Sequence, residues 1–179
     1  NIKLLMEDIQ KISESNSKTL AHPITLGVIP TISPFLLPHA IQTLEKKFPD
    51  LNLIISEGQS DDLILKVKNG ELDMAILALP YKLQGLIPIK FWSEDFFWIT
   101  KKSDRRSKVK EIKASDLEFS ELLLLEDGNC LKDHVLSACK MTKKKRNISF
   151  KASSLNTLVQ FVKSGLGTTL VPKMAVNQL

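Results

Sequence analysis

The chain has 179 residues, 43% of them hydrophobic, and a formal net charge of +5. This length suffices for one domain or two small lobes, and no apolar run approaches the roughly 18 residues that a membrane-spanning helix needs. Two cysteines do not make a disulfide framework in a chain this long, so composition excludes membrane-spanning and disulfide-stapled proteins and predicts a soluble, intracellular one.

Basic residues gather in two runs, six of them in KKSDRRSKVK (101–110) and four in KKKR (143–146). Such runs are typical of nucleic-acid-binding surfaces and also of solvated loops. No helix-turn-helix or zinc-ligand pattern accompanies them, which favours solvated loops.

The first 18 residues differ in pattern from the rest of the chain. Apolar residues recur at helical spacing in residues 1–12, and the polar stretch SESNSK (13–18) is typical of a linker.

From Ile24 onward, short apolar strands alternate with amphipathic helices. In the first half, strands are predicted at 24–29, 51–56 and 72–79, and helices at 33–48 and 60–70. Ser33 can cap the first of these helices, and Pro34 suits its first turn.

The alternation repeats in the second half. Strands are predicted at 96–100, 122–125, 147–153 and 167–172, and helices at 129–140 and 154–165, the last with Ser153 or Ser154 as its cap. This pattern predicts an α/β fold with parallel sheets and helices on their faces. The long non-helical span at about 80–110 predicts two lobes, with a ligand cleft at the strand ends between them.

The two cysteines, Cys130 and Cys139, lie nine positions apart in the predicted helix 129–140. Nine steps along an α-helix cover roughly 13.5 Å and about half a turn in phase, whereas a disulfide needs Cα atoms within about 7 Å. The cysteines therefore cannot bond while the helix is intact. If they do bond, the segment has two incompatible structures, which is the physical basis of a switch.

Their surroundings also differ. Cys130 opens the helix, where backbone N–H groups, the helix dipole and Lys132 favour a thiolate, although Asp127 and Asp133 oppose it. Cys139 lies on the apolar stripe and is expected to be buried and unreactive. A thiolate can react with a peroxide to give a sulfenic acid, which a second thiol converts to a disulfide. The plainer interpretation is two small core residues, and the scattered histidines do not have the spacing of metal ligands.

Four segments carry a resemblance to a known family: LGVIPTISPFLLPHAIQTLEKKFPDL, ELDMAILAL, LLLLEDGNCLKDHVLSAC and SFKASSLNTLVQFVKSGLGTTLVP. They resemble the regulatory domain of the OxyR family, the peroxide-sensing transcription regulators of the LysR type. The resemblance implies an α/β fold of two lobes like that of periplasmic binding proteins. It places the end of a linker helix and a linker at 1–20, lobe I at 21–94 and the redox-active lobe II at 95–179. The family's DNA-binding domain is expected to be absent from this chain.

The resemblance also implies roles for individual residues. Cys130 would be the peroxide-reactive cysteine and Cys139 its disulfide partner. The family's peroxide pocket maps onto four positions, Thr31, Ser60, Asn129 and Asp133. Asn129 stands where the family has a histidine, and it can donate a hydrogen bond but cannot accept a proton at neutral pH. A second family histidine is Ser149 here.

By the same resemblance, the chain is a regulator and not an enzyme, and it uses no metal or organic cofactor. It would respond to hydrogen peroxide in the bacterial cytoplasm by forming a reversible Cys130–Cys139 disulfide. The implied partners are a second copy of itself (a dimer, and a tetramer at full length), promoter DNA through the missing N-terminal domain, and a thiol reductant such as glutaredoxin. No membrane is involved.

Two alternatives remain open. One is a LysR-type domain that senses a small-molecule co-inducer in the cleft between the lobes, with Thr31 and Ser33 as anion-binding residues before a helix. The other is a thiol peroxidase, which would consume many equivalents of peroxide when a reductant is supplied.

Overall fold

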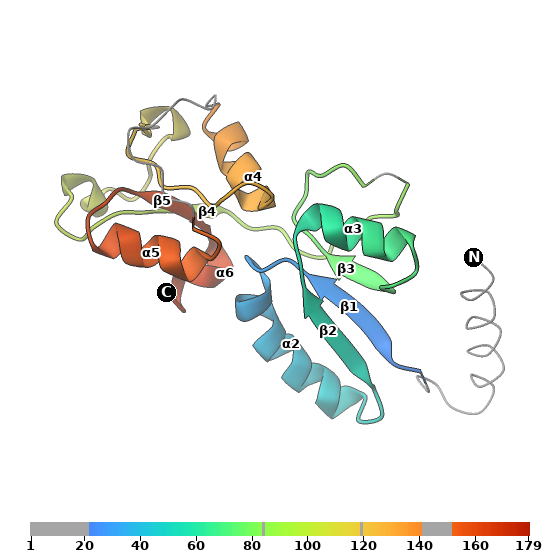
Figure 1. Cartoon of the computed structure of the whole chain (residues 1–179). Coiled ribbons are helices and arrows are strands. Elements are labelled where there is room, and N and C mark those ends of the chain that lie inside the picture. Colours follow the sequence, from blue (N-terminus) through green and yellow to red (C-terminus); the bar gives the residue numbers. More distant parts are fainter. Residues whose placement is uncertain (1–21, 84, 119, 141–151) are drawn as a thin grey trace. The chain divides into compact units, whose positions relative to one another are not determined.

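The computed structural model describes residues 22–83, 85–118, 120–140 and 152–179 (Figure 1). They form two compact units. The first holds the described residues up to Leu77 together with those of Leu83–Leu86, and the second holds those of Ala78–Lys82 and Ile87–Leu179. The chain therefore passes from the first unit into the second, returns briefly, and crosses again.

The first unit is a parallel sheet with two connecting helices. Strand β1 (Ile24–Val28) lies between β2 (Leu53–Glu57) and β3 (Met74–Ile76). Helix α2 (Ser33–Lys47) joins β1 to β2, and α3 (Ser60–Lys68) joins β2 to β3 (Figure 1). This is the predicted order of strands and helices, and its parallel pairing follows from the helical crossover between successive strands.

The second unit combines one antiparallel strand pair with helices. Strand β4 (Phe96–Ile99) pairs with β5 (Thr169–Pro172). The α-helices are α4 (Cys130–Ala138), α5 (Leu155–Lys163) and α6 (Lys173–Val176), and two 3-10 helices are η1 (Arg105–Lys108) and η2 (Ala114–Asp116). The largest fully buried side chains described in this unit are Leu122, Leu123, Val135, Leu158, Val159, Val162 and Val171.

Two predictions for the second half are wrong. Residues 122–125 are not a strand, because only Leu122 and Leu125 form isolated bridges, to Thr168 and Ala152. Three of these four leucines are buried, so the run of apolar residues indicates burial and not a continuous ladder of strand hydrogen bonds. In addition, β4 and β5 are antiparallel and not parallel. They lie far apart in the sequence, so no single helical crossover fixes their relative direction. The predicted strand 147–153 lies mostly outside the described residues.

The helix ends are partly as expected. Ser33 is not a cap, because α2 begins at Ser33 itself and Ile32 before it already has helical dihedrals. Ser154 does cap α5, and its Oγ accepts a hydrogen bond from Thr157 N at 3.2 Å. Gly70 and Gly165 follow α3 and α5 with φ of +74° and +81°, as helix stops in the left-handed region do.

Candidate functional site

A tight turn places Cys130 at the first residue of α4. Asn129 N donates to Glu126 O at 3.4 Å and closes a four-residue turn, within which Gly128 has φ of +92°. That left-handed conformation at the third position of a turn favours glycine. The DGN sequence before Cys130 is therefore a turn that fixes where the helix starts.

The two cysteines lie at opposite ends of one helix and are not joined by a disulfide. Cys139 N donates to Val135 O at 3.0 Å, so the helical hydrogen bonding that begins at Cys130 continues as far as Cys139. At about 1.5 Å of rise per residue, their Cα atoms are separated by roughly 13.5 Å along the helix axis, about twice the limit for a disulfide. The structure is that of the dithiol form.

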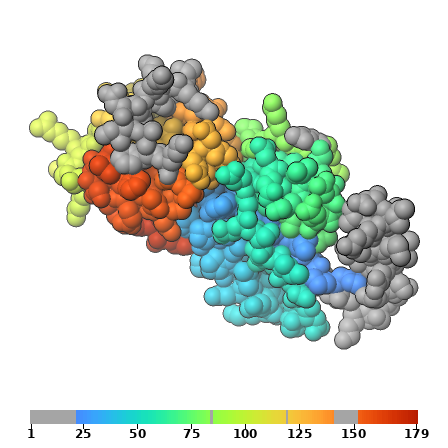
Figure 2. Space-filling view, in the orientation of Figure 1, coloured from blue at the N-terminus to red at the C-terminus, as the bar shows by residue number. Residues whose placement is uncertain are grey.

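Both sulfur-bearing side chains are buried, with Cys130 3% and Cys139 6% exposed. The α4 segment itself reaches the surface, where its atoms are orange in Figure 2. Burial raises the pKa of the Cys139 thiol above its ordinary value of 9.0, because a thiolate there would lose its water. Cys139 is therefore a thiol at neutral pH, in the buried setting that its place on the apolar stripe predicts.

Charges near Cys130 are partly neutralised within the turn. Lys132 Nζ lies 2.7 Å from Asp127 Oδ1, so the lysine expected to favour a Cys130 thiolate is instead paired with one of the two opposing aspartates. Asp133 lies in the first turn of α4 and is exposed. The start of the helix, with its backbone N–H groups, remains as the feature that favours negative charge at this end.

Asn129 has a local structural task. Asn129 is 7% exposed, and its Nδ2 donates to Glu126 O at 3.3 Å, so the amide stabilises the turn and does not cap α4. One amide hydrogen is used in this way, and the other can be offered to a bound molecule. The structure thus brings Asn129, Cys130 and Asp133 together on the second unit.

The two remaining pocket residues lie in the first unit. Thr31 lies three residues after the end of β1, and Ser60 begins α3 three residues after the end of β2. Since β1 and β2 are neighbouring parallel strands, both hydroxyls follow the carboxyl edge of the sheet, where ligands of α/β proteins bind. Ser60 is 1% exposed, and within the described part of the chain its Oγ has no hydrogen-bond partner. A pocket formed by all four residues remains a prediction.

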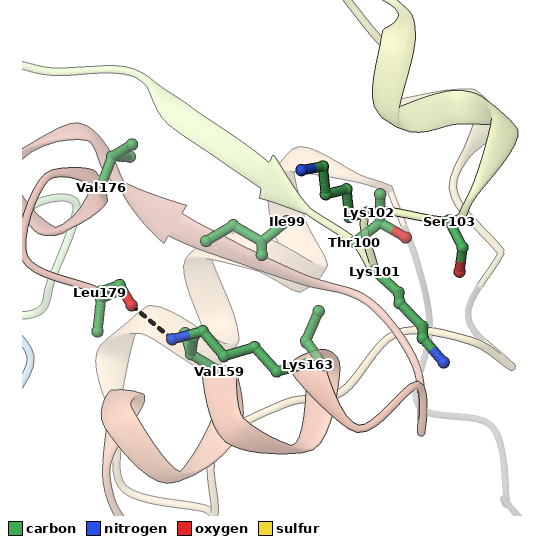
Figure 3. A pocket seen from close by; sticks show the side chains of 10 residues that line it. Ile99, Thr100, Lys101, Lys102, Ser103, Val159, Lys163, Val176 and Leu179 are labelled. Atoms are coloured by element: carbon green, nitrogen blue, oxygen red, sulfur yellow. Dashed lines mark hydrogen bonds between the residues drawn. The ribbon is translucent and has the colours of Figure 1, made fainter.

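Two surface hollows that the described residues of the second unit form are lined by none of the predicted site residues. The larger, of about 640 Å³, lies between the end of β4 and α5, where Lys163 Nζ donates to Leu179 O at 2.7 Å (Figure 3). The smaller, of about 400 Å³, adjoins Arg106. Arg106 binds both Asp104 and Glu121 at 2.8 Å, so one member of the 101–110 basic run serves the fold itself.

Sequence reasoning missed His134. Its Nε2 lies 3.0 Å from the carbonyl oxygen of Pro80, in the crossover segment Ala78–Lys82. The only sequence signal was its position four residues after Cys130, on the same side of the helix.

Among the described residues, no cluster of three potential ligands could hold a metal ion, and no helix has the length and apolar character to cross a membrane.

Comparisons with known proteins agree with this architecture. The family model of the LysR substrate binding domain matches residues 17–179. The HTH-type transcriptional regulator EstR of Acinetobacter baylyi is 40% identical over 171 residues, which are 96% of this chain and 56% of that protein. The hydrogen peroxide-inducible genes activator of Dickeya chrysanthemi is 32% identical over 170 residues, 95% of this chain and 56% of that protein.

A solved structure gives the same result. The reduced form of the regulatory domain of OxyR2 from Vibrio vulnificus has a TM-score of 0.78 and 39% identity, and the match covers 90% of this chain and 76% of that one. The chain spans about half the length of the curated relatives it matches, 56% for both named above. The predicted α/β class and the resemblance to OxyR regulatory domains are confirmed. The chain belongs to the LysR substrate binding domain family of transcription regulators.

Proposed function

We propose that this domain senses hydrogen peroxide through a reversible disulfide between Cys130 and Cys139, and so regulates transcription. The observation that carries the proposal is the placement of the two cysteines at the two ends of one helix, in a fold shared with the OxyR2 regulatory domain. If the cysteines served only as small core residues, nothing would require them to lie at the two ends of one helix.

The chemistry takes two steps. The thiolate of Cys130 attacks one oxygen of hydrogen peroxide, the O–O bond breaks, and hydroxide leaves and is protonated to water. Cys130 is then a sulfenic acid. The sulfur of Cys139 attacks the sulfenic sulfur, an S–S bond forms, and the S–O bond breaks with release of a second water. In total, two thiols lose two electrons and two protons, and one peroxide molecule becomes two waters.

The pocket residues would position the oxidant. A peroxide molecule could form hydrogen bonds with the hydroxyls of Thr31 and Ser60 and with the second amide hydrogen of Asn129. Among the described residues, the Oγ of Ser60 has no hydrogen-bond partner. Asp133 would lie beside the reacting sulfur. Because Asn129 cannot accept a proton, proton removal must rely on other groups or on solvent.

The second step requires α4 to unwind. The helix buries Leu131, Val135 and Leu136 along with the cysteines, and each fully buried apolar side chain of this size contributes about 1.5–3 kcal/mol. The dithiol fold therefore resists closure, and the energy of peroxide reduction must offset the loss of these contacts. A change of this size in a folded domain is one that a neighbouring domain or subunit can detect.

The wider role follows from the same proposal. The protein would act on promoter DNA through a separate N-terminal domain, as a dimer and, at full length, a tetramer. It would work in the bacterial cytoplasm, where thiols are held reduced and a reductant such as glutaredoxin can reset the switch. It would be a regulator that reacts once per switching event, and not an enzyme with multiple turnovers.

Thiol mass analysis tests the proposal. One equivalent of peroxide should remove two hydrogens from the wild-type chain and protect both cysteines from alkylation, and a thiol reductant should restore them. Cys139→Ser should stop at a sulfenic acid on Cys130, and Cys130→Ser should leave Cys139 as a thiol. An absent bridge, or oxidation of Cys139 in Cys130→Ser, would contradict the proposal.

A second candidate is a small-molecule sensor. Two buried hydroxyl residues, Thr31 and Ser60, lie near the starts of α2 and α3, and helix starts favour anions. The EstR relative is also named a transcriptional regulator without mention of peroxide. A Cys130→Ser protein that keeps its full transcriptional response, together with a Ser60→Ala protein that loses it, would favour this function over the disulfide switch.

A further inference from the structure

His134 joins the helix that carries both cysteines to the segment by which the chain crosses between its two units. Its Nε2 lies 3.0 Å from the carbonyl oxygen of Pro80. Pro80 belongs to Ala78–Lys82, which is part of the second unit, whereas Leu77 before it and Leu83 after it belong to the first. The bond therefore connects α4 to a short crossover whose two ends both continue into the first unit.

The roles in this hydrogen bond are fixed by chemistry. A carbonyl oxygen can only accept, so Nε2 of His134 carries the hydrogen in the neutral tautomer as well as in the imidazolium. Proline has no N–H of its own, so the carbonyl is the one backbone group that Pro80 can offer to a neighbour. The contact is thus a specific donor–acceptor pair that depends on where α4 places one side chain.

That placement requires an intact helix. His134 lies four residues after Cys130 and five before Cys139, in the middle of the segment that must leave helical geometry before the sulfurs can meet. When this backbone is rearranged, the ring of His134 is no longer held opposite the Pro80 carbonyl. The hydrogen bond is therefore compatible with the dithiol form and not with a disulfide between the two ends of α4.

We propose that His134 transmits the redox state of the cysteines to the crossover segment: the reduced helix holds Ala78–Lys82 through the bond to Pro80, and disulfide formation releases it. This inference rests on the proposed disulfide switch and adds the route by which the switch reaches the rest of the chain. The crossover runs on from β3 (Met74–Ile76) on one side and returns at Leu83 on the other, so its release removes a restraint at both connections to the first unit.

Linkage makes the proposal quantitative. A bond present only in the dithiol form stabilises that form, and its removal must shift the dithiol–disulfide equilibrium toward the disulfide. A typical net hydrogen bond corresponds to a shift of about 2- to 10-fold in the equilibrium constant. Removal should also speed the closure step, which needs the helix to open, and leave the attack of Cys130 on peroxide unchanged.

Three variants separate the hydrogen bond from other effects of the side chain. His134→Phe keeps a ring of similar shape and removes the donor. His134→Gln keeps an N–H donor without a ring, and should rescue the wild-type behaviour. Ser137→Ala changes an exposed residue of the same helix and serves as the matched control.

The experiment has two readouts on each purified variant. The first is the fraction of Cys130–Cys139 disulfide at equilibrium in glutathione buffers, with the rate of sulfenic acid formation measured in a Cys139→Ser background. The second is tryptic cleavage after Lys82, read by mass spectrometry against cleavage after Lys47 in α2. A side chain that only stabilised α4 would not change cleavage in the crossover.

The expected result is a shift of about 2- to 10-fold toward the disulfide in His134→Phe, with faster cleavage after Lys82 both in that reduced variant and in oxidised wild-type protein. His134→Gln and Ser137→Ala should match wild type. Equal behaviour of the Phe and Gln variants, an unchanged Lys82 cleavage, or a slower sulfenic acid step in His134→Phe would overturn the inference. If the wild-type chain forms no disulfide at all, the proposed function fails instead.

Discussion

The two cysteines share one side chain chemistry and differ in what their backbone neighbours supply. Cys130 sits at the first residue of α4, after a turn that the glycine at 128 makes possible. Cys139 follows the last turn, and its burial raises the pKa of its thiol. The start of a helix favours the thiolate that attacks a peroxide, whereas the buried thiol of Cys139 has to lose its proton to attack the sulfenic sulfur.

The titration of Cys139 gives a prediction at this scale. Burial raises the pKa of its thiol above 9.0, so as pH rises the unfolded chain loses this proton before the folded chain does. The stability that the buried thiol contributes is complete below about pH 9 and is lost as pH rises through the higher folded pKa. The urea midpoint of Cys130→Ser should therefore fall more steeply above about pH 9 than that of the double variant Cys130→Ser/Cys139→Ser. Parallel curves would show that the thiol is not buried in solution.

At the scale of single elements, the start of α5 was predicted to within one residue, whereas the cap predicted at Ser33 was wrong. Gly165 ends α5 with positive φ, and one of two adjacent serines was expected to begin it. The structure selects Ser154, whose Oγ accepts from Thr157 N, and leaves Ser153 exposed before the helix. Ser154→Ala should lower the free energy of unfolding by about 1 kcal/mol, and Ser153→Ala should leave it nearly unchanged. Urea unfolding of both variants measures this, and an equal loss in the two would place the cap elsewhere.

Other elements were misread because their outcome depends on contacts distant in sequence. Three leucines of the run 122–125 are buried, yet its bridges to other segments are isolated ones, at Leu122 and Leu125, and do not continue into a ladder. Burial is visible in a run of apolar residues, whereas the partner of each backbone group is not. The direction of β4 against β5 was unreadable for the same reason.

In the candidate site, too, features set by local sequence were predicted and features set by distant contacts were not. The helix and the burial of Cys139 followed from spacing and from the apolar stripe. The role of Lys132 did not, because its pairing with Asp127 depends on how the turn folds back. His134 was invisible as a contact, since its acceptor lies 54 positions away in the chain. Local patterns thus located the helix that carries both cysteines, and tertiary contacts decided what it touches.

At the scale of the whole molecule, the chain comprises two compact units connected by more than one crossing. The predicted boundary between lobes, at 94 and 95, stays a prediction, and the unit to which Ala78–Lys82 belongs was not foreseen. Because α4 and this crossover belong to the same unit, the proposed disulfide would act first on a connection between the units. A signal that starts with one bond between two sulfur atoms can in this way reach the rest of the protein.

Hydrogen exchange of the α4 amides, measured in the same sample before and after one equivalent of peroxide, tests most directly whether the disulfide and the helix exclude each other. We predict that the amide of Cys139, bonded to Val135 O in the dithiol form, loses roughly tenfold or more of its protection once the intramolecular disulfide has formed. The dithiol form and an oxidised sample re-reduced with a thiol should share one exchange pattern. A complete intramolecular disulfide together with unchanged protection across residues 134–139 would contradict this account.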